Sequence, residues 1–213
     1  MQLTNSFKPD DHEAWYDRGV ALNKLGDYQQ EIASYDKALS FKPDDHEAWY
    51  DRGVALNKLG DYQQAIASYD KALSFKPHRH EAWYNRGNAL YKLGDYSQAI
   101  ASYDKALRCK PDLHPAWYNR GLALGNLGDA IFGVQSKLGD YQEAIASYDK
   151  ALKFKPDYHQ ALYNKACCYA LTGENTLAIE NLQQAIALNP DEYREKAKTE
   201  SAFIALQRHI MTL

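Results

Sequence analysis

The residues of this chain best suited to chemistry are three His-Glu dipeptides. They are His12-Glu13, His46-Glu47 and His80-Glu81. Zinc proteases use H-E-x-x-H on a helix, because two histidines four residues apart bind one ion and the glutamate activates water. Here the fifth position holds Tyr16, Tyr50 or Tyr84, so the second zinc ligand is missing. The dipeptides therefore do not predict a zinc enzyme.

A column of histidines accompanies these dipeptides. Its members are His12, His46, His80, His114 and His159. Neighbouring members are expected to begin helices whose axes lie about 8–10 Å apart, whereas nitrogens that bind zinc lie about 2.0–2.1 Å from the ion. We interpret them as first-turn helix residues and expect no metal site. The sequence also contains no G-x-S-x-G, Walker or G-x-G-x-x-G motif, so we predict no enzyme and no cofactor.

Composition narrows the class of partner. The net charge of −3 offers no basic surface for the phosphates of nucleic acid. There is no long uncharged apolar run, so neither a membrane span nor a signal peptide is predicted. Three cysteines, Cys109, Cys167 and Cys168, form an odd set without C-x-x-C spacing, which indicates a reduced, cytoplasmic protein.

The elements that position these residues follow from one spacing. The four tryptophans are Trp15, Trp49, Trp83 and Trp117, and each lies 34 residues after the one before. Residues 7–40 and 41–74 differ at one position only, where Glu31 corresponds to Ala65. A fixed period of this length predicts an array of small stacked units, because one such unit cannot bury its apolar face alone.

One unit, residues 41–74, predicts two helices. Asp44 and Glu47 form a helix start, and apolar residues at helical spacing continue to Leu59. Gly60 and Asp61 then break this helix, so a second helix is expected from about residue 62 to 75, ended by Pro77. The expected fold class is therefore all-α.

The pattern resembles the tetratricopeptide repeat, a helix-turn-helix of about 34 residues with the consensus W-x2-L-G-x2-Y…A-x3-F…P. The second unit has Trp49, Arg52, Gly53, Leu56, Ala65, Tyr69 and Pro77 at these places, with Arg for the family's Leu and Leu for its Tyr. The C-terminal segment is similar to tails of bacterial, in particular cyanobacterial, arrays of this family. The resemblance implies a right-handed α-α superhelical solenoid of stacked helix-turn-helix units.

The resemblance divides the chain into five repeats with additions at both ends. The expected boundaries are 1–11 for a segment similar to the tail of a preceding repeat, 12–45, 46–79, 80–113, 114–158 and 159–192 for the repeats, and 193–213 for a capping helix. The fifth repeat is degenerate, with Leu162 at the Trp position. The N-terminal segment indicates either a piece of a longer array or a first helix that is partly uncovered.

Eleven extra residues, 129–139, interrupt the fourth repeat. Leu-Gly-Asp at 127–129 is followed by a second Leu-Gly-Asp at 138–140. We expect the second helix of this repeat to begin near residue 142, and the insert to leave and return as a loop or short helix. It would then expose Ile131, Phe132 and Val134 as an apolar patch for self-association. The alternative is a broken solenoid that is completed by exchange of repeats between two chains.

The resemblance also implies that the first helix of each repeat lines a concave groove. The implied peptide-binding residues are Tyr16, Tyr50, Asp51, Asn57, Lys58, Tyr84, Asn85, Asn88, Tyr91, Lys92, Tyr118 and Asn119. A row of tyrosines beside Asn and Asp suits an extended peptide, because amides hydrogen-bond its backbone and rings pack its side chains. The tyrosine row could equally be ordinary scaffold. Asp and Glu in the first two repeats favour a basic peptide segment there.

These patterns predict a non-catalytic scaffold that binds an extended peptide or a partner protein. The tyrosines stand where the family's clamp for acidic chaperone tails uses a Lys, so such tails are disfavoured. The alternative function is self-assembly into a homo-oligomer through the uncovered N-terminal face or the insert.

Glu31 is a local exception to the repeat pattern. The other repeats have alanine at this place, where the two helices of a repeat meet closely. Burial of an unpaired carboxylate is costly because the group loses its hydration. We therefore expect the second helix of the first repeat to shift or fray so that Glu31 reaches water, or Arg18 or another cation to pair with it.

Overall fold

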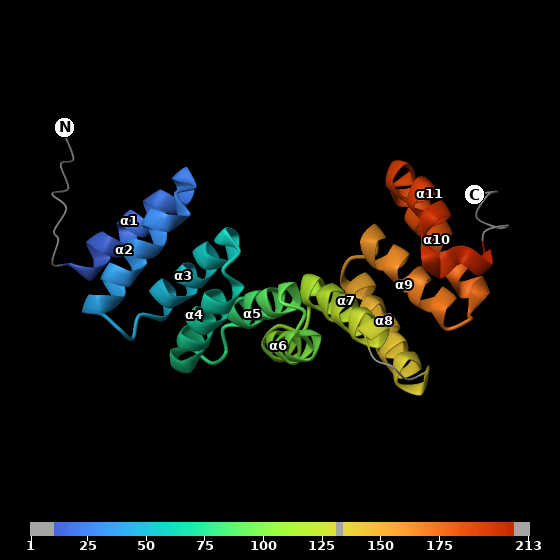
Figure 1. Cartoon of the computed structure of the whole chain (residues 1–213), viewed down its shortest axis with the longest axis horizontal. Coiled ribbons are helices and arrows are strands. Elements are labelled where there is room, and N and C mark those ends of the chain that lie inside the picture. The colour runs from blue at the N-terminus through green and yellow to red at the C-terminus, as the bar shows by residue number, and fades with distance from the viewer. Residues whose placement is uncertain (1–10, 131–133, 207–213) are drawn as a thin grey trace. The chain divides into compact units, whose positions relative to one another are not determined.

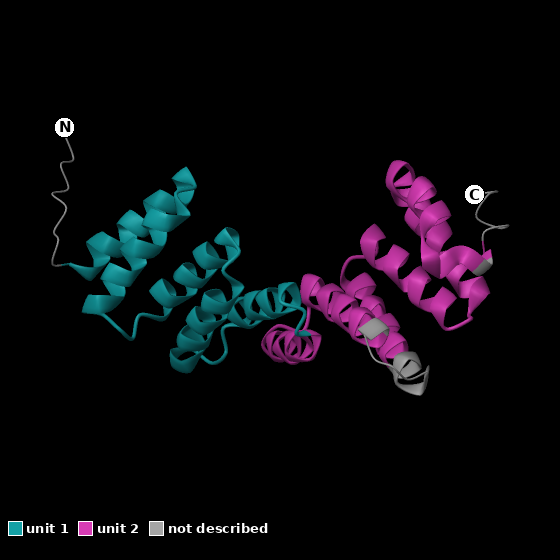
Figure 2. Cartoon of the chain, in the orientation of Figure 1, with its two compact units in different colours: residues 1–95 teal, residues 96–213 magenta. Residues whose placement is uncertain are grey.

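The computed structural model describes residues 11–130 and 134–206, without the side chains of 129–139 and 205. Within these ranges the chain forms eleven α-helices and one 3-10 helix, and no strand (Figure 1). The all-α prediction is confirmed. The helices group into two compact units, residues 1–95 and 96–213 (Figure 2).

Unit 1 contains two complete helix pairs and the first helix of a third. The helices are α1 (His12–Leu25), α2 (Tyr28–Phe41), α3 (His46–Leu59), α4 (Tyr62–Phe75) and α5 (His80–Lys92). From α1 to α5, each helix packs on the next one in sequence. This arrangement of successive pairs is the one that the 34-residue period predicts.

Short polar residues and glycine set the helix ends in unit 1. The Asp45 carboxylate accepts hydrogen bonds from the backbone N–H of Glu47 at 3.0 Å and of Ala48 at 3.3 Å, and so caps α3. Gly60 ends the helix in the left-handed conformation, with φ of 84°. The predicted break at Gly60-Asp61 is confirmed, and α4 begins at the predicted residue.

A close contact between glycine and tyrosine holds each pair together. A Cβ atom added at Gly53 would lie 2.6 Å from the Tyr69 ring, and the tyrosine is fully buried. Only glycine therefore allows α3 and α4 to approach this closely. Ala65 and Ala72 on α4 are also fully buried, as expected for small residues where two helices meet.

The arginine that replaces the family's leucine ties three helices together. Arg52 on α3 donates from Nη1 to Ser68 Oγ of α4 at 2.7 Å and from Nε to Asp36 Oδ1 of α2 at 2.6 Å. Arg86 makes the same bond to Asp70 at 2.7 Å. The substitution is thus a polar link between neighbouring repeats.

The periodic tryptophans and prolines are also connected. Trp49 Nε1 donates to the carbonyl oxygen of Pro43 at 2.9 Å, and Trp83 makes the equivalent bond to Pro77 at 2.8 Å. Each tryptophan therefore anchors its helix to the loop that precedes it.

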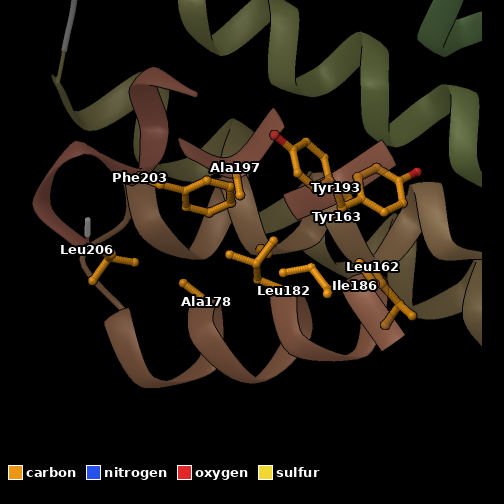
Figure 3. Close-up of a cluster of buried hydrophobic side chains, with 11 residues drawn as sticks. Leu162, Tyr163, Ala178, Leu182, Ile186, Tyr193, Ala197, Phe203 and Leu206 are labelled. Carbon is orange, nitrogen blue, oxygen red and sulfur yellow. The ribbon is translucent and has the colours of Figure 1, made fainter. Parts of the chain in front are cut away.

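Unit 2 continues the pairing and ends in a different arrangement. Its helices are α6 (Tyr96–Cys109), α7 (His114–Ala130), α8 (Val134–Phe154), α9 (His159–Leu171), α10 (Asn175–Leu188) and α11 (Pro190–Thr199), with the 3-10 helix η1 (Ser201–Leu206). Tyr193, Phe203 and Leu206 from the last two elements are buried with Leu182 of α10 (Figure 3). The predicted C-terminal helix thus begins three residues earlier, at Pro190, and is followed by a separate 3-10 turn.

The prediction for the insert was wrong. The helix α8 begins at Val134 and has 21 residues, whereas α4 has 14, and α7 reaches Ala130 with 17 residues. Because both antiparallel helices are lengthened at the end where they are joined, they stay paired. The start of α7 and the end of α8 keep their positions in the repeat. Ile131 and Phe132 lie outside the described residues, as does the side chain of Val134.

Candidate functional site

Hydrogen bonds connect the predicted peptide-binding residues of neighbouring repeats. The Tyr16 hydroxyl on α1 donates to Asp51 Oδ2 on α3 at 2.7 Å. One repeat later, Asn85 Nδ2 on α5 donates to the Tyr50 hydroxyl at 3.0 Å. We call this series of contacts the Tyr–Asx ladder. It was not predicted, because the sequence does not give the distance between corresponding residues of successive repeats.

The ladder recurs in unit 2. Asn164 Nδ2 on α9 donates to the Tyr118 hydroxyl on α7 at 3.1 Å. At the next place the series ends, because the Tyr163 ring stacks on Tyr193 with centroids 4.7 Å apart and is buried. The terminal elements α11 and η1 therefore cover this face of α9.

The predicted residues fall into two groups by exposure. Tyr16, Tyr50, Asp51, Asn57, Tyr84, Asn85, Asn88, Tyr91, Tyr118 and Asn119 are partly buried, while Lys58 and Lys92 are exposed. Burial and the hydrogen bond to Asp51 raise the pKa of Tyr16, which therefore stays protonated at neutral pH. Burial also raises the pKa of Asp51, although the Tyr16 hydrogen bond and the Arg79 charge oppose the shift. We call the ten members in unit 1, from Tyr16 to Lys92, the helix-A face.

Arg79 contacts the helix-A face and was not among the predicted residues. Its Nη1 lies 2.7 Å from Glu47 Oε2, and its guanidinium carbon lies 3.8 Å from the centre of the Tyr50 ring. Arg79 stands where Asp11 and Asp45 cap the earlier helices, and it makes no capping hydrogen bond. This departure from the repeat was the available signal. Arg79 therefore neutralises Glu47, which lies outside the ten residues of the helix-A face, and partly covers the ring of Tyr50, which belongs to it.

The histidines make local contacts with different partners. His46 Nδ1 lies 3.3 Å from Glu47 Oε1, and His80 Nδ1 lies 3.3 Å from Glu81 Oε2. His159 Nδ1 lies 2.8 Å from the Tyr193 hydroxyl in unit 2. The part of the chain that the structure describes holds no group of three or more His, Cys, Asp or Glu side chains able to bind a metal ion. Nor does it hold a helix with the length and hydropathy needed to cross a bilayer.

The expected fraying of the helix that carries Glu31 and the expected pairing of Glu31 with Arg18 were both wrong. The helix α2 is regular, and the Glu31 side chain is fully buried. Its donor is the amide of Asn23, whose Nδ2 lies 2.8 Å from Oε1, while Oε2 has no hydrogen-bond partner among the described residues. Arg18 instead donates to Ser34 and Gln30. Burial raises the pKa of Glu31, and the Asn23 hydrogen bond and the Lys58 charge partly oppose this shift.

Comparisons with known families cover most of the chain. Models described as tetratricopeptide repeat match residues 80–113, 102–146 and 134–193, and one described as TPR repeat matches 19–60 and 55–94. No match was found among curated protein sequences.

Solved structures with the same fold include MamA, at 23% identity and a TM-score of 0.76, with 89% of this chain and 95% of that chain covered. MamA 41-end from Desulfovibrio magneticus RS-1 has 20% identity and a TM-score of 0.76, with 88% and 99% covered. YrrB, described as a TPR protein with an unusual peptide-binding site, has 22% identity and a TM-score of 0.74, with 96% and 93% covered. These identities show a shared fold alone. The family matches, which together span residues 19–193, establish that the chain belongs to the tetratricopeptide repeat family.

Proposed function

We propose that this protein is a non-catalytic interaction scaffold that binds an extended peptide segment of a partner protein along the helix-A face. The observation that carries the proposal is the Tyr–Asx ladder. Its hydrogen bonds hold Tyr16 and Tyr50 in place before any partner arrives, while their rings stay partly exposed. A surface ordered in advance loses less side-chain entropy on binding, which favours affinity.

The charges of the helix-A face favour a basic segment opposite α1 and α3. Asp51 is the ladder residue of α3, whereas Asn85 occupies the same place in α5. Arg79 pairs with Glu47, and its charge also acts on Asp51, but the hydrogen-bond donor to Asp51 among the described residues is the Tyr16 hydroxyl. A lysine or arginine of the peptide beside Asp51 therefore gains a charge-assisted hydrogen bond.

Selection from a phage-displayed library of random twelve-residue peptides, followed by calorimetric titration of the selected peptide, tests the proposal. We expect Tyr84→Ala with Asn85→Ala to weaken binding at least about tenfold, an effect of about 1.4 kcal/mol. The matched control is Gln63→Ala with Lys71→Ala, two exposed residues of α4. Equal losses in the two double variants, at unchanged helical content, would contradict binding at the helix-A face.

Self-assembly through the N-terminal face is the second candidate. One observation favours it, namely that Leu25 at the end of α1 is 80% exposed. Light scattering on the full chain and on a variant lacking 129–139 tests this candidate. A monomer at all concentrations in both proteins would contradict it.

A further inference from the structure

The helices α1 and α3 have the same fourteen-residue sequence but bury different surfaces. Ala48 and Ala55 of α3 are fully buried, and Leu56 is 4% exposed. The equivalents in α1 are Ala14, Ala21 and Leu22. Of these, Ala21 is exposed, and Ala14 and Leu22 are partly exposed. Since the two sequences are identical, the difference comes from their neighbours alone.

The neighbour that closes this surface of α3 is α2. Its Ile32 packs against the buried cluster around Leu56, and its Asp36 pairs with Arg52. Ile32 and Asp36 are four residues apart, so they lie on one face of the helix. The helix α4 presents the same pair to α5, with Asp70 bound to Arg86. No described helix occupies the corresponding place beside α1.

Within the described residues, Arg18 lacks the aspartate partner that the equivalent arginines of the later repeats have. Arg52, Arg86 and Arg120 each direct Nε to an aspartate of the preceding helix, at 2.6, 2.7 and 2.7 Å. The printed bonds of Arg18 run to Ser34 and Gln30, two neutral side chains of α2. None of the described acidic residues forms an ion pair with it. The outer face of α1, defined by Ala14, Arg18, Ala21 and Leu25, thus combines open apolar surface with a cation.

We propose that this outer face binds an amphipathic helix of another protein, one that carries an aliphatic residue and, four positions later, an aspartate or glutamate opposite Arg18. The binding mode is the one that α2 and α4 already use on α3 and α5. The surface is distinct from the helix-A face, so the proposal stands independently of peptide binding there.

A second copy of this chain fits the surface poorly. The aspartates that corresponding helices could offer are Asp36, Asp70, Asp104 and Asp149, and each already pairs with a cation of its own chain. Arg18 lies near the middle of α1. A two-fold axis that pairs α1 with its copy antiparallel would therefore bring two guanidinium groups together. The charge pattern thus selects a different polypeptide.

The chain itself supplies a probe for this surface. A fluorescent peptide with the sequence of residues 62–77 contains Ile66 and Asp70, and a hydrocarbon staple between the exposed positions 63 and 67 keeps it helical. Titration with the full chain should give saturable binding of one peptide per chain. Arg18→Gln, or Asp70→Asn in the peptide, should weaken binding at least about fivefold, and the two changes together should weaken it little further.

Two control variants separate this outcome from general effects. Arg52→Gln makes the same change on a surface that α2 already covers, so the affinity for the peptide should not change. Leu25→Lys alters a residue that is 80% exposed and should reduce binding without loss of folding. Absence of saturable binding, or equal affinity in the Arg18→Gln variant, overturns the proposal. A dimer of the chain alone that dissociates on Leu25→Lys would also overturn it, because the occupant would then be a second copy.

Discussion

The first and second repeats are nearly the same molecule in two surroundings. Residues 7–40 and 41–74 differ only at Glu31 and Ala65, and α1 and α3 do not differ at all. Yet Leu56 is 4% exposed, while Leu22 remains partly exposed. In a stacked array the burial of a residue depends on the next unit as well as on its own. The comparison separates what a repeat encodes from what its neighbour adds.

The largest effect is expected when the equivalent leucines of the first two repeats, Leu22 and Leu56, are each replaced by alanine. Leu56→Ala should lower the free energy of unfolding by about 3 kcal/mol, because it removes a buried side chain and leaves a cavity. Leu22→Ala should cost about 1 kcal/mol, since part of that side chain already contacts water. Urea denaturation of both variants measures the difference. Equal losses would show that α1 is covered in solution.

Glycine substitutions test whether the two helix pairs are equally tight. A Cβ atom would lie 2.5 Å from the Tyr35 ring at Gly19 and 2.6 Å from the Tyr69 ring at Gly53. Both Gly→Ala changes should therefore destabilise the chain by about 1–3 kcal/mol. Gly53→Ala should cost more, because repeats on both sides restrain its neighbours. A smaller loss for Gly53→Ala in thermal denaturation would contradict this ranking.

The single sequence difference between the repeats should reduce stability at neutral pH. Glu31→Ala makes residues 7–40 identical to 41–74 and removes a buried carboxylate oxygen that has no hydrogen-bond partner among the described residues. We expect the free energy of unfolding to rise by about 1 kcal/mol, and the melting temperature with it. No change in either quantity would indicate that water reaches Glu31 in solution.

The gain from Glu31→Ala should depend on pH. The pKa of Glu31 is raised in the folded state. At pH values between the ordinary and the raised pKa, the folded chain therefore binds more protons than the unfolded chain. The stabilising contribution of this proton is complete below the ordinary pKa and is lost as pH rises through the raised one. The advantage of the alanine variant should therefore shrink from pH 7 to pH 5. Asp51 and Lys58 are present in both proteins, so their own titrations largely cancel.

The smallest expected effect concerns the Tyr–Asx ladder. Asn85→Ala removes one hydrogen bond to Tyr50 between partly exposed groups, and should cost about 0.5–1 kcal/mol. Asp51→Asn, which makes the second repeat resemble the third, should cost no more than this. Thermal denaturation at neutral pH gives both values. A loss above about 2 kcal/mol would mean that the ladder is a major source of stability.

The sequence predicted what lies within one repeat. Gly60 and Pro77 gave the end of α3 and the end of α4, because their backbone chemistry is local. The predicted start of α3 at Asp44 was one residue off, since Asp45 caps the helix. The resemblance to a known family supplied the order of stacking. The predicted surface residues lie on the first helices of the repeats, as the resemblance implied.

The features that escaped prediction depend on the distance between units. The bond between Tyr16 and Asp51 joins residues 35 positions apart, and the role of Arg79 depends on a ring in the preceding repeat. The insert extended both α7 and α8, because paired growth keeps a helical hairpin in register while satisfying its backbone hydrogen bonds. Glu31 stayed buried because Asn23, a neutral residue one helix away, supplied its donor.

The central claim is that the helix-A face binds the partner segment. Its most direct test is a nuclear magnetic resonance titration of the chain, carrying tyrosines with 13C-labelled rings, with the peptide selected from the random library. We predict that the ring signals of Tyr50 and Tyr84 shift in proportion to bound peptide, while that of Tyr62 at the start of α4 does not. Shifts confined to Tyr62, with Tyr50 and Tyr84 unchanged at saturation, would contradict the claim.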